Sequence, residues 1–246
     1  MISAVILTKN SQRTLKPLLE ALKSIDVVLF DTGSTDNTLD IAKTFSNVQV
    51  FSRKIENIGF GPLKNEAAAL AKHDWILSID SDELPSEGLI SFLLKEKLHT
   101  KCVYSFPFHN YYKKKRIYGC GWNPESHIRL YNQKVTKFSD DLVHEKILIN
   151  SCKVVKLPYP LLHFSYLCIG DFIDKLQRYS TLFAQQNHEK KSSSFTKAFF
   201  HGFFAFFKSY FLKRGIFDGK EGIIISWYNG SVAFIKYLKL HEKNKC

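Results

Sequence analysis

The chain has 246 residues, enough to bury a full hydrophobic core as one large domain or as one domain with a smaller appendage. Its 35 Lys and Arg against 23 Asp and Glu give a net charge of +12, which indicates an acidic partner such as nucleotide phosphates, nucleic acid or an anionic membrane. The five cysteines show neither paired spacing nor a CxxC motif, so they resemble reduced cytosolic thiols and indicate neither a zinc site nor a disulfide framework. The chain also enters a strand pattern directly, without an export signal, and no apolar run reaches the roughly 18 residues that span a bilayer.

The first half of the chain alternates short apolar runs with stretches of helical spacing. The apolar runs predict strands at residues 3–8, 27–30 and 48–51 and a further strand beginning at residue 75. The helical stretches between them lie at residues 13–25, 39–45 and 64–72. Such alternation is typical of a parallel sheet covered by helices, with right-handed crossovers. We therefore predict an α/β fold with a mostly parallel sheet flanked by helices.

Polar residues follow the predicted strands where three of them end. Thr8 and Asn10 follow the first strand, Asp31 follows the second, and Asp80 and Asp82 follow the fourth. The carboxyl ends of parallel strands meet at the crevice where open α/β sheets bind their ligands. Two close, unpaired carboxylates repel, and a divalent cation is a usual relief. The pattern favours a nucleotide pocket, although Asp-Ser-Asp-Glu is also ordinary surface-turn chemistry. Without a Walker A loop or GxGxxG, ordinary ATPase and dinucleotide readings are weak.

Four segments resemble glycosyltransferase family 2, the inverting enzymes of the GT-A fold, in both order and spacing. They are residues 4–10 (AVILTKN), 30–38 (FDTGSTDNT), 59–67 (GFGPLKNEA) and 77–83 (LSIDSDE). The resemblance covers roughly residues 1–150 and is closest to the bacterial branch that builds lipopolysaccharide cores. Residues 210–219 and 234–242 also resemble segments of that branch. It implies a GT-A (Rossmann-like) sheet and transfer of a hexose, glucose by analogy with the branch, from a nucleotide-diphosphate sugar, such as a UDP-hexose, to a lipid-linked saccharide.

The resemblance also implies roles for individual residues. Those expected to bind the nucleotide sugar are Thr8, Asn10, Asp31, Lys64, Asn65 and Asp80. Asp82, the last residue of the DxD motif, would contact a Mn²⁺ or Mg²⁺ ion that bridges the diphosphate. Thr32 stands where many relatives have a second Asp, so the division of nucleotide contacts around Asp31 stays open.

An inverting transfer also needs a base on the acceptor's side of the sugar. The nucleotide diphosphate leaves as a cation stabilises its charge, and the base takes the proton of the acceptor hydroxyl. Residues 140–145 (DDLVHE) resemble the branch's Val-His-Glu segment. We predict Glu145 as the general base, with Asp141 as the alternative, and His144 as a further metal ligand or an acceptor contact. A capping or surface acid is the competing interpretation.

The last third of the chain has a composition of its own. A polar break at residues 187–194 predicts a boundary between a catalytic domain (1–186), ending in a helix over 171–186, and a helical region (187–246). Nine of the 21 Phe lie in residues 195–217, and eleven Lys or Arg against four Asp or Glu follow residue 187. An aromatic helix stripe with a basic opposite face favours an anionic membrane surface, and hence a cytoplasmic protein peripheral on the inner face of the membrane. The alternative is packing on the catalytic domain or on a second subunit.

Two other function classes stay open at this point. A phosphohydrolase of the haloacid dehalogenase type would use Asp80 as nucleophile and Asp140 and Asp141 as metal ligands, but its motif usually follows the first strand of the domain. A nucleic-acid-binding module would use the basic, aromatic run at residues 111–118, which is equally typical of a hairpin tip. Because the phenylalanines cluster at helical spacing, which buries a face, we do not expect nucleic acid as a partner.

Overall fold

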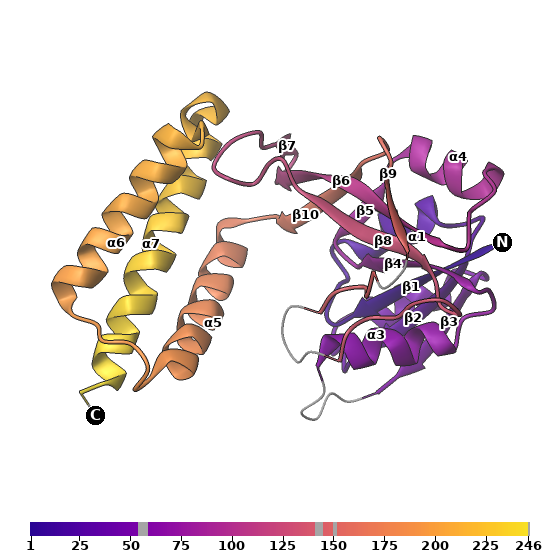
Figure 1. Ribbon diagram of the computed structural model, residues 1–246, viewed down its shortest axis with the longest axis horizontal. Helices are drawn as coiled ribbons and strands as arrows, with labels where there is room; N and C mark the ends of the chain where they lie inside the picture. The colour runs from indigo at the N-terminus through magenta and orange to yellow at the C-terminus, as the bar shows by residue number, and fades with distance from the viewer. Residues whose placement is uncertain (54–58, 141–144, 150–151, 246) are drawn as a thin grey trace. The chain divides into compact units, whose positions relative to one another are not determined.

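The computed structural model describes residues 1–53, 59–140, 145–149 and 152–245 (Figure 1). The chain forms two compact units, one of residues 1–108 and 126–163 and the other of residues 109–125 and 164–246. Within the described residues, four cysteines are free thiols, namely Cys102, Cys120, Cys152 and Cys168. The division into a catalytic part and a membrane-associating part at residues 186 and 187 stays a prediction.

The first unit is built on parallel strands joined by helices. The strands are β1 (Ile2–Thr8), β2 (Asp26–Asp31), β3 (Val48–Ser52) and β4 (Trp75–Asp80), and the helices are α1 (Leu15–Ala21), α2 (Thr38–Lys43) and α3 (Phe60–Ala69). The order across the sheet is β3-β2-β1-β4, so β1 lies between β2 and β4. The predicted α/β fold, with a mostly parallel sheet flanked by helices and a helical C-terminal region, is confirmed.

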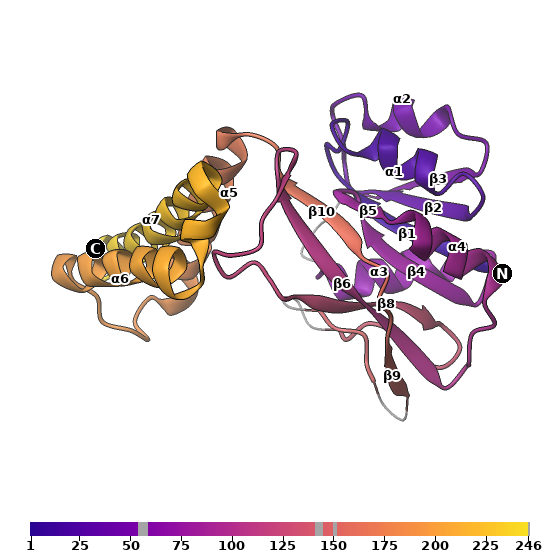
Figure 2. The same ribbon diagram turned by 90° about the horizontal axis from the view of Figure 1, so that it is seen from above.

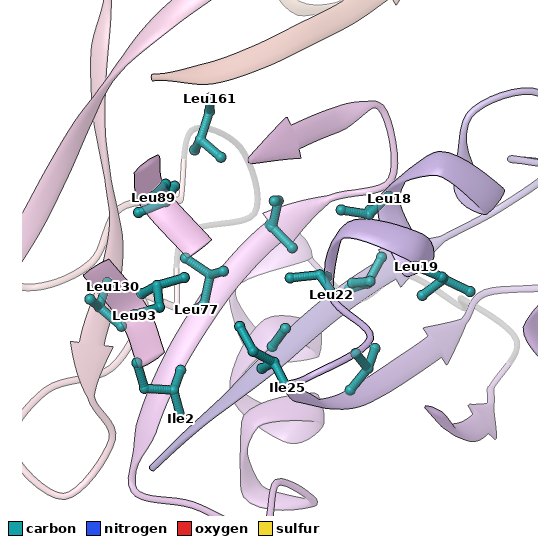
Figure 3. Packing of buried hydrophobic residues seen from close by; sticks show 14 of the residues in the cluster. Ile2, Leu18, Leu19, Leu22, Ile25, Leu77, Leu89, Leu93, Leu130 and Leu161 are labelled. Carbon is teal, nitrogen blue, oxygen red and sulfur yellow. The ribbon is translucent and has the colours of Figure 1, made fainter. Parts of the chain in front are cut away.

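Helices cover both faces of this sheet, which explains why its strands read as unbroken apolar runs (Figure 2). On one face, Leu18 of α1, Leu22 just after this helix and Leu77 of β4 belong to one hydrophobic cluster (Figure 3). Ile6 of β1 belongs to the same cluster. On the other face, Leu63 of α3 packs with Val5, the neighbour of Ile6. Successive residues of a strand point to opposite faces, so β1 contributes to both clusters. Burying one such side chain stabilises the fold by about 1.5–3 kcal/mol.

Antiparallel pairing begins after β4. The elements that follow are β5 (Glu83–Pro85), α4 (Glu87–Lys95), β6 (Cys102–Tyr112), β7 (Lys115–Arg116), β8 (Ser126–Asn132), β9 (Lys153–Lys156) and β10 (Leu161–Tyr166). β8 runs antiparallel to β4, with Leu130 opposite Leu77. β10 runs antiparallel to β5, with His163 opposite Glu83. These two pairings bring residues that are distant in the sequence to the end of β4.

The second unit is mainly helical. It contains α5 (Ile169–Asn187), α6 (Phe195–Phe207), a π-helical turn η1 (Lys208–Leu212), a 3-10 turn η2 (Gly215–Asp218) and α7 (Gly219–Lys243). Stacked rings form its core, since the ring of Tyr166 lies 5.2 Å from that of Trp122 and 4.1 Å from that of Phe172. The predicted helix at residues 171–186 is confirmed within α5.

Helix α7 has 25 residues and carries the polar residue Asn229 near its middle. The structure explains how a helix accommodates this polar residue. The amide of Asn229 donates to Ser209 Oγ at 2.9 Å and to the carbonyl of Cys120 at 3.3 Å, so it is satisfied inside the unit. In the part of the chain that the structure describes, none of the helices combines the length and apolar character needed to cross a bilayer.

Candidate functional site

The turn after β2 is organised by the carboxylate of Asp31. Asp31 is almost fully buried, and its Oδ2 accepts hydrogen bonds from the backbone N–H of Gly33 at 3.0 Å and of Ser34 at 3.1 Å. Its Oδ1 accepts a 2.5 Å bond from Ser34 Oγ. Gly33 has a φ of +102°, a conformation that favours glycine. The sequence Asp-Thr-Gly-Ser therefore specifies one turn around a buried, hydrogen-bonded carboxyl group.

The loop after β1 is bonded to this turn. Asn10 Oδ1 accepts a 2.7 Å bond from the N–H of Thr35, and the N–H of Asn10 donates to Ser34 Oγ at 2.9 Å. The carbonyl of Thr8 accepts bonds from both the N–H and the Oγ1 of Thr32, at 2.9 and 3.0 Å. The ends of β1 and β2 therefore lie together, and Thr32 links them through its two hydrogen bonds to Thr8. The roles of Thr8, Asn10 and Asp31 in donor binding stay predictions.

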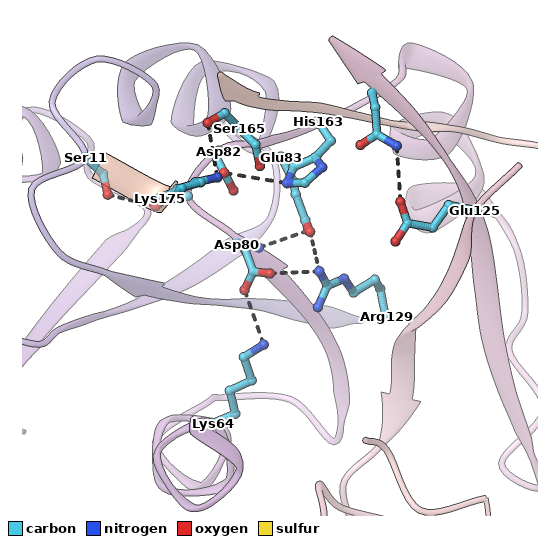
Figure 4. A network of polar contacts seen from close by, with 12 residues as sticks. Ser11, Lys64, Asp80, Asp82, Glu83, Glu125, Arg129, His163, Ser165 and Lys175 are labelled. Atoms are coloured by element: carbon cyan, nitrogen blue, oxygen red, sulfur yellow. Dashed lines mark hydrogen bonds and ion pairs between the residues drawn. The ribbon is translucent and has the colours of Figure 1, made fainter. Parts of the chain in front are cut away.

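Asp80, at the end of β4, lies between two cations (Figure 4). Its Oδ1 is 3.2 Å from Lys64 Nζ of α3, and its Oδ2 is 2.8 Å from the guanidinium of Arg129 of β8. The side chains of Lys64 and Arg129 are only 7% and 12% exposed, whereas that of Asp80 is 37% exposed, so solvent screens these pairs less than it screens an ion pair on the surface. Burial alone would raise the pKa of Asp80, but Arg129 and Lys64 outweigh it and hold this pKa well below its usual range.

A second acid shares the same guanidinium. Glu83 is almost fully buried, its carboxylate contacts Arg129, and its Oε2 accepts a 3.0 Å bond from the backbone N–H of Asp80. Burial, together with the neighbouring Asp80 carboxylate, raises the pKa of Glu83 above its ordinary value despite Arg129. The Asp-Ser-Asp-Glu segment is therefore fixed from inside the protein at both ends, which argues against a solvated surface turn.

Asp82 faces a different partner from Asp80. Its Oδ2 lies 3.6 Å from Nε2 of His163, and both side chains are partly exposed, 32% and 25%. A carboxylate oxygen and an imidazole nitrogen facing each other at a strand end are donors that Mn²⁺ accepts, and Mg²⁺ takes the carboxylate readily. The donor set thus fits the metal that the fold family implies. Among the described residues, no group of three or more His, Cys, Asp and Glu is arranged to hold a metal ion.

Glu145 approaches the same site through Lys64. Its Oε1 lies 3.2 Å from Lys64 Nζ, which thereby bridges Glu145 and Asp80. Phe138, which forms a β-bridge with Ile147 close to Glu145, is held by Asn65 of α3. The side-chain amide of Asn65 accepts a hydrogen bond from the N–H of Phe138 at 2.9 Å and donates one to its carbonyl at 3.0 Å. Asp141 and His144, the other predicted members of this cluster, lie outside the described residues.

Lys64 and Asn65, which were predicted to bind the donor, both make contacts that stabilise the fold around the site. Lys64 links two carboxylates, and Asn65 holds the backbone of Phe138 against α3. Neither contact tests a role toward the nucleotide, which stays a prediction for both residues.

Comparison with known families and proteins identifies the family of the chain. Residues 3–153, which include β1 to β4, Arg129 and Glu145, match the family Glycosyl transferase family 2. The chain belongs to this family. It is therefore a nucleotide-sugar glycosyltransferase.

Full-length similarity extends to bacterial glycosyltransferases. The chain is 27% identical to an uncharacterized glycosyltransferase of Rickettsia typhi, over 98% of this chain and 87% of that protein. It is 26% identical to the lipopolysaccharide core biosynthesis glycosyltransferase LpsC of Rhizobium meliloti, over 99% of this chain and 93% of that protein. A solved structure of a mannosyltransferase of Pyrobaculum calidifontis, in complex with GDP-Man and Mn²⁺, is 12% identical, with a TM-score of 0.49 over 95% of this chain and 73% of that one.

Sequence reasoning missed three residues of the site, Glu83, Arg129 and His163. Glu83 was visible as the last acid of the motif, but its burial could not be read from a run that also resembles a turn. Arg129 carried a weak signal, because it is a cation between Ile128 and Leu130 in the predicted strand. His163 carried no signal of its own, and only the pairing of β10 with β5 places it opposite Glu83.

Proposed function

We propose that this protein is a metal-dependent, inverting hexosyltransferase that moves a hexose from a nucleotide-diphosphate sugar to a lipid-linked saccharide such as the lipopolysaccharide core. The supporting observation is the end of β4, where Asp80 is balanced by Lys64 and Arg129 while Asp82 is left facing His163. Asp80 is paired with two cations of the protein, whereas Asp82 and His163 bring a carboxylate oxygen and an imidazole nitrogen to the same strand end, which are donors that a divalent cation accepts.

The residues of the first unit divide the work of such a reaction. The converged loops that contain Asn10 and Asp31 would receive the nucleoside, and Asp82 with His163 would hold Mn²⁺ or Mg²⁺. When bound, the ion stabilises the charge that develops on the departing diphosphate. Glu145 would take the proton of the acceptor hydroxyl as the acceptor oxygen bonds to the anomeric carbon and the bond to the diphosphate breaks. Lys64, between Glu145 and Asp80, orients both carboxylates.

The acceptor and the location are proposed on separate grounds. LpsC, similar over nearly its whole length, is a lipopolysaccharide core enzyme by name, and such an acceptor is held at a membrane. We therefore propose a lipid-linked saccharide as acceptor, and a protein peripheral on the inner face of the cytoplasmic membrane. Glucose, as a UDP-sugar, is the hexose we propose to test first.

The two competing functions are less compatible with the contacts. A phosphohydrolase nucleophile at Asp80 would need a free carboxylate oxygen, whereas both oxygens of Asp80 are paired with cations. In the basic run, Tyr112 is buried and Tyr111 stacks on Phe164 at 4.9 Å, at the tip of a hairpin in which β6 pairs with β7. Those rings are occupied by protein and are poorly placed to stack on bases.

A donor panel tests the proposal. Nucleotide sugars would be added with Mn²⁺, and binding measured by thermal shift and then by slow hydrolysis of the donor. We expect one UDP-hexose to stabilise the protein, by about 2.7 kcal/mol at a hundredfold excess over its Kd. The shift should disappear in Asp82→Ala and persist in Asp74→Ala, a matched change of an exposed Asp just before β4. Equal stabilisation of Asp82→Ala and the unchanged protein would remove Asp82 from the metal site.

A further inference from the structure

The second unit leaves an unusually aromatic surface uncovered. Beyond its first turn, α6 has five phenylalanines that are between 40% and 63% exposed, namely Phe199, Phe200, Phe203, Phe204 and Phe207. Trp227 of α7 is 69% exposed. Single exposed apolar residues are ordinary, but a contiguous group of large rings marks an interaction surface. We name these six residues the aromatic face.

A groove lies within the aromatic face, between α6 and α7. It has a volume of about 440 Å³, and its walls include Phe199, Phe203 and Phe206 from α6 and Trp227 and Phe234 from α7. This volume lies within the range of small-molecule sites. Its lining is almost wholly apolar, so it offers nothing to a nucleotide or a sugar. The chemistry of the walls fits a hydrocarbon chain.

Two glycines give the groove its shape. A Cβ on Gly202 would lie 2.8 Å from Cβ of Phe234, and a Cβ on Gly230 would lie 3.0 Å from Cβ of Phe206. The two helices therefore approach closely at this point, and the large rings on either side stand above the glycines as walls. The groove is a built feature of the α6–α7 pair.

Cations and exposed apolar side chains alternate where α6 gives way to α7. Leu212 and Phe217 are 64% and 82% exposed, and Lys213 and Arg214 lie between them, also exposed. A hollow of about 620 Å³ adjoins these cations, with Tyr118 in its lining. This segment, residues 211–217, is named the basic tip. Its composition suits the boundary between phosphate headgroups and acyl chains.

The nearby acids do not neutralise the basic tip. Asp218 is almost fully buried and accepts bonds from the N–H groups of Tyr118 and Gly119, at 3.0 and 2.7 Å. Glu221 pairs with Lys115 at 2.8 Å. Lys213 and Arg214 therefore keep their positive charge at the end of the α6–α7 pair, next to the exposed side chains of Leu212 and Phe217.

This charge decides between two possible occupants of the aromatic face. A second copy of the chain, docked symmetrically, would apply the same patch to itself and bring the cations of both copies together. An anionic lipid surface instead supplies the opposite charge to Lys213 and Arg214 and hydrocarbon to the rings. We propose that the aromatic face and the basic tip dock on anionic lipid, and that the groove between α6 and α7 takes up one acyl chain. This site does not depend on the donor chemistry proposed for the first unit.

Vesicle sedimentation tests the docking. Unilamellar vesicles of phosphatidylglycerol and phosphatidylcholine should bind the full chain, and pure phosphatidylcholine should bind it at least about tenfold more weakly, with binding to the anionic vesicles reduced by salt. The double variant F203S/F204S should bind at least about tenfold more weakly, because each buried ring contributes about a factor of ten. The double variant K213E/R214E should lose at least about tenfold. L94S and K95E, exposed changes on α4, serve as matched controls and should bind normally.

The same variants separate this proposal from the proposed transferase activity. Each should keep the thermal unfolding of the unchanged chain and any donor hydrolysis, since the substituted side chains are exposed and lie in the second unit. Equal binding by F203S/F204S and the unchanged chain would overturn the proposal. A different result would also overturn it: light scattering shows that the unchanged chain is a dimer and F203S/F204S a monomer, while neither protein binds vesicles.

The groove has a test of its own in the fluorescence of Trp227. Phosphatidylglycerol brominated in its acyl chain should quench the tryptophan emission of the bound protein, and most of that quenching should vanish in Trp227→Phe. Sedimentation with the vesicles but no quenching difference between the two proteins would show adsorption by charge alone and overturn uptake of a chain.

Discussion

The two units depart from the usual distribution of side chains in opposite ways: the first buries charged groups, and the second exposes large apolar rings. In the first unit, Asp80, Glu83, Lys64 and Arg129 form a charged network that is largely removed from water. In the second unit, the rings of the aromatic face are held in water. Buried charge and exposed apolar surface are both unfavourable for a chain that only has to fold. The first feature supports the proposed site for a charged donor and metal ion, and the second supports the proposed site for lipid.

The largest effect we expect comes from removing the shared cation of the first unit. Arg129→Met leaves Asp80 and Glu83 without their common partner, and breaking a buried pair in this way costs about 3–5 kcal/mol. Urea unfolding would measure it. Arg53→Met is the matched control, because the Arg53–Glu66 pair is exposed on both sides and should contribute less than about 1 kcal/mol. Similar losses for both variants would mean that the network is no more than a surface pair.

Loss of the proposed base should affect chemistry and spare binding. Glu145→Gln keeps the shape of the side chain near Lys64 but cannot take a proton, so transfer should fall by about 10²–10⁴-fold. The Kd for the donor should stay within about twofold. Once an acceptor is identified, steady-state turnover and donor titration separate the two quantities. Unchanged turnover would move the role to Asp141 or His144.

A change in the second unit should have a smaller effect on stability. Gly202→Ala places a methyl group 2.8 Å from Cβ of Phe234, and such overpacking costs about 1–3 kcal/mol. Gly170→Ala is the control, since the added atom would meet only the Cys168 sulfur, at 3.4 Å. Both variants can be compared by thermal unfolding. If Gly202→Ala unfolds like Gly170→Ala, the helices do not need this close approach.

The smallest effect we expect is on how the stability of the protein depends on pH in the acidic range. The pKa of Asp80 is lowered on folding, so the unfolded chain binds more protons near and below the ordinary value of 3.8, and stability falls as pH falls. Between pH 6 and pH 3 only the first part of this titration is reached. The difference in unfolding midpoint between the unchanged protein and Asp80→Asn should therefore shrink over that interval. A constant difference would show that the cations do not lower the pKa of Asp80.

The parallel half of the sheet could be predicted from the sequence because its signals are local. An apolar run buried on both faces has to be a strand or a helix, and runs as short as those of β1 and β2 fit strands. Parallel strands bring their carboxyl ends to one edge, so the order of elements predicted that the ends of β1, β2 and β4 lie side by side. The family resemblance rested on the same local segments and is confirmed.

The partners of the acids depended on long-range pairing, which local patterns do not encode. Arg129 reaches Asp80 because β8 adds antiparallel to β4, and His163 reaches Asp82 because β10 pairs with β5. In the same way, the hydrogen-bond partners of Asn229 in α7 are contributed by other segments of the second unit, at Cys120 and Ser209. The sequence by itself determined where charge and apolar surface occur along this chain. Only the tertiary structure decided which charges are paired and which rings stay exposed, because pairing and burial depend on what lies across the fold.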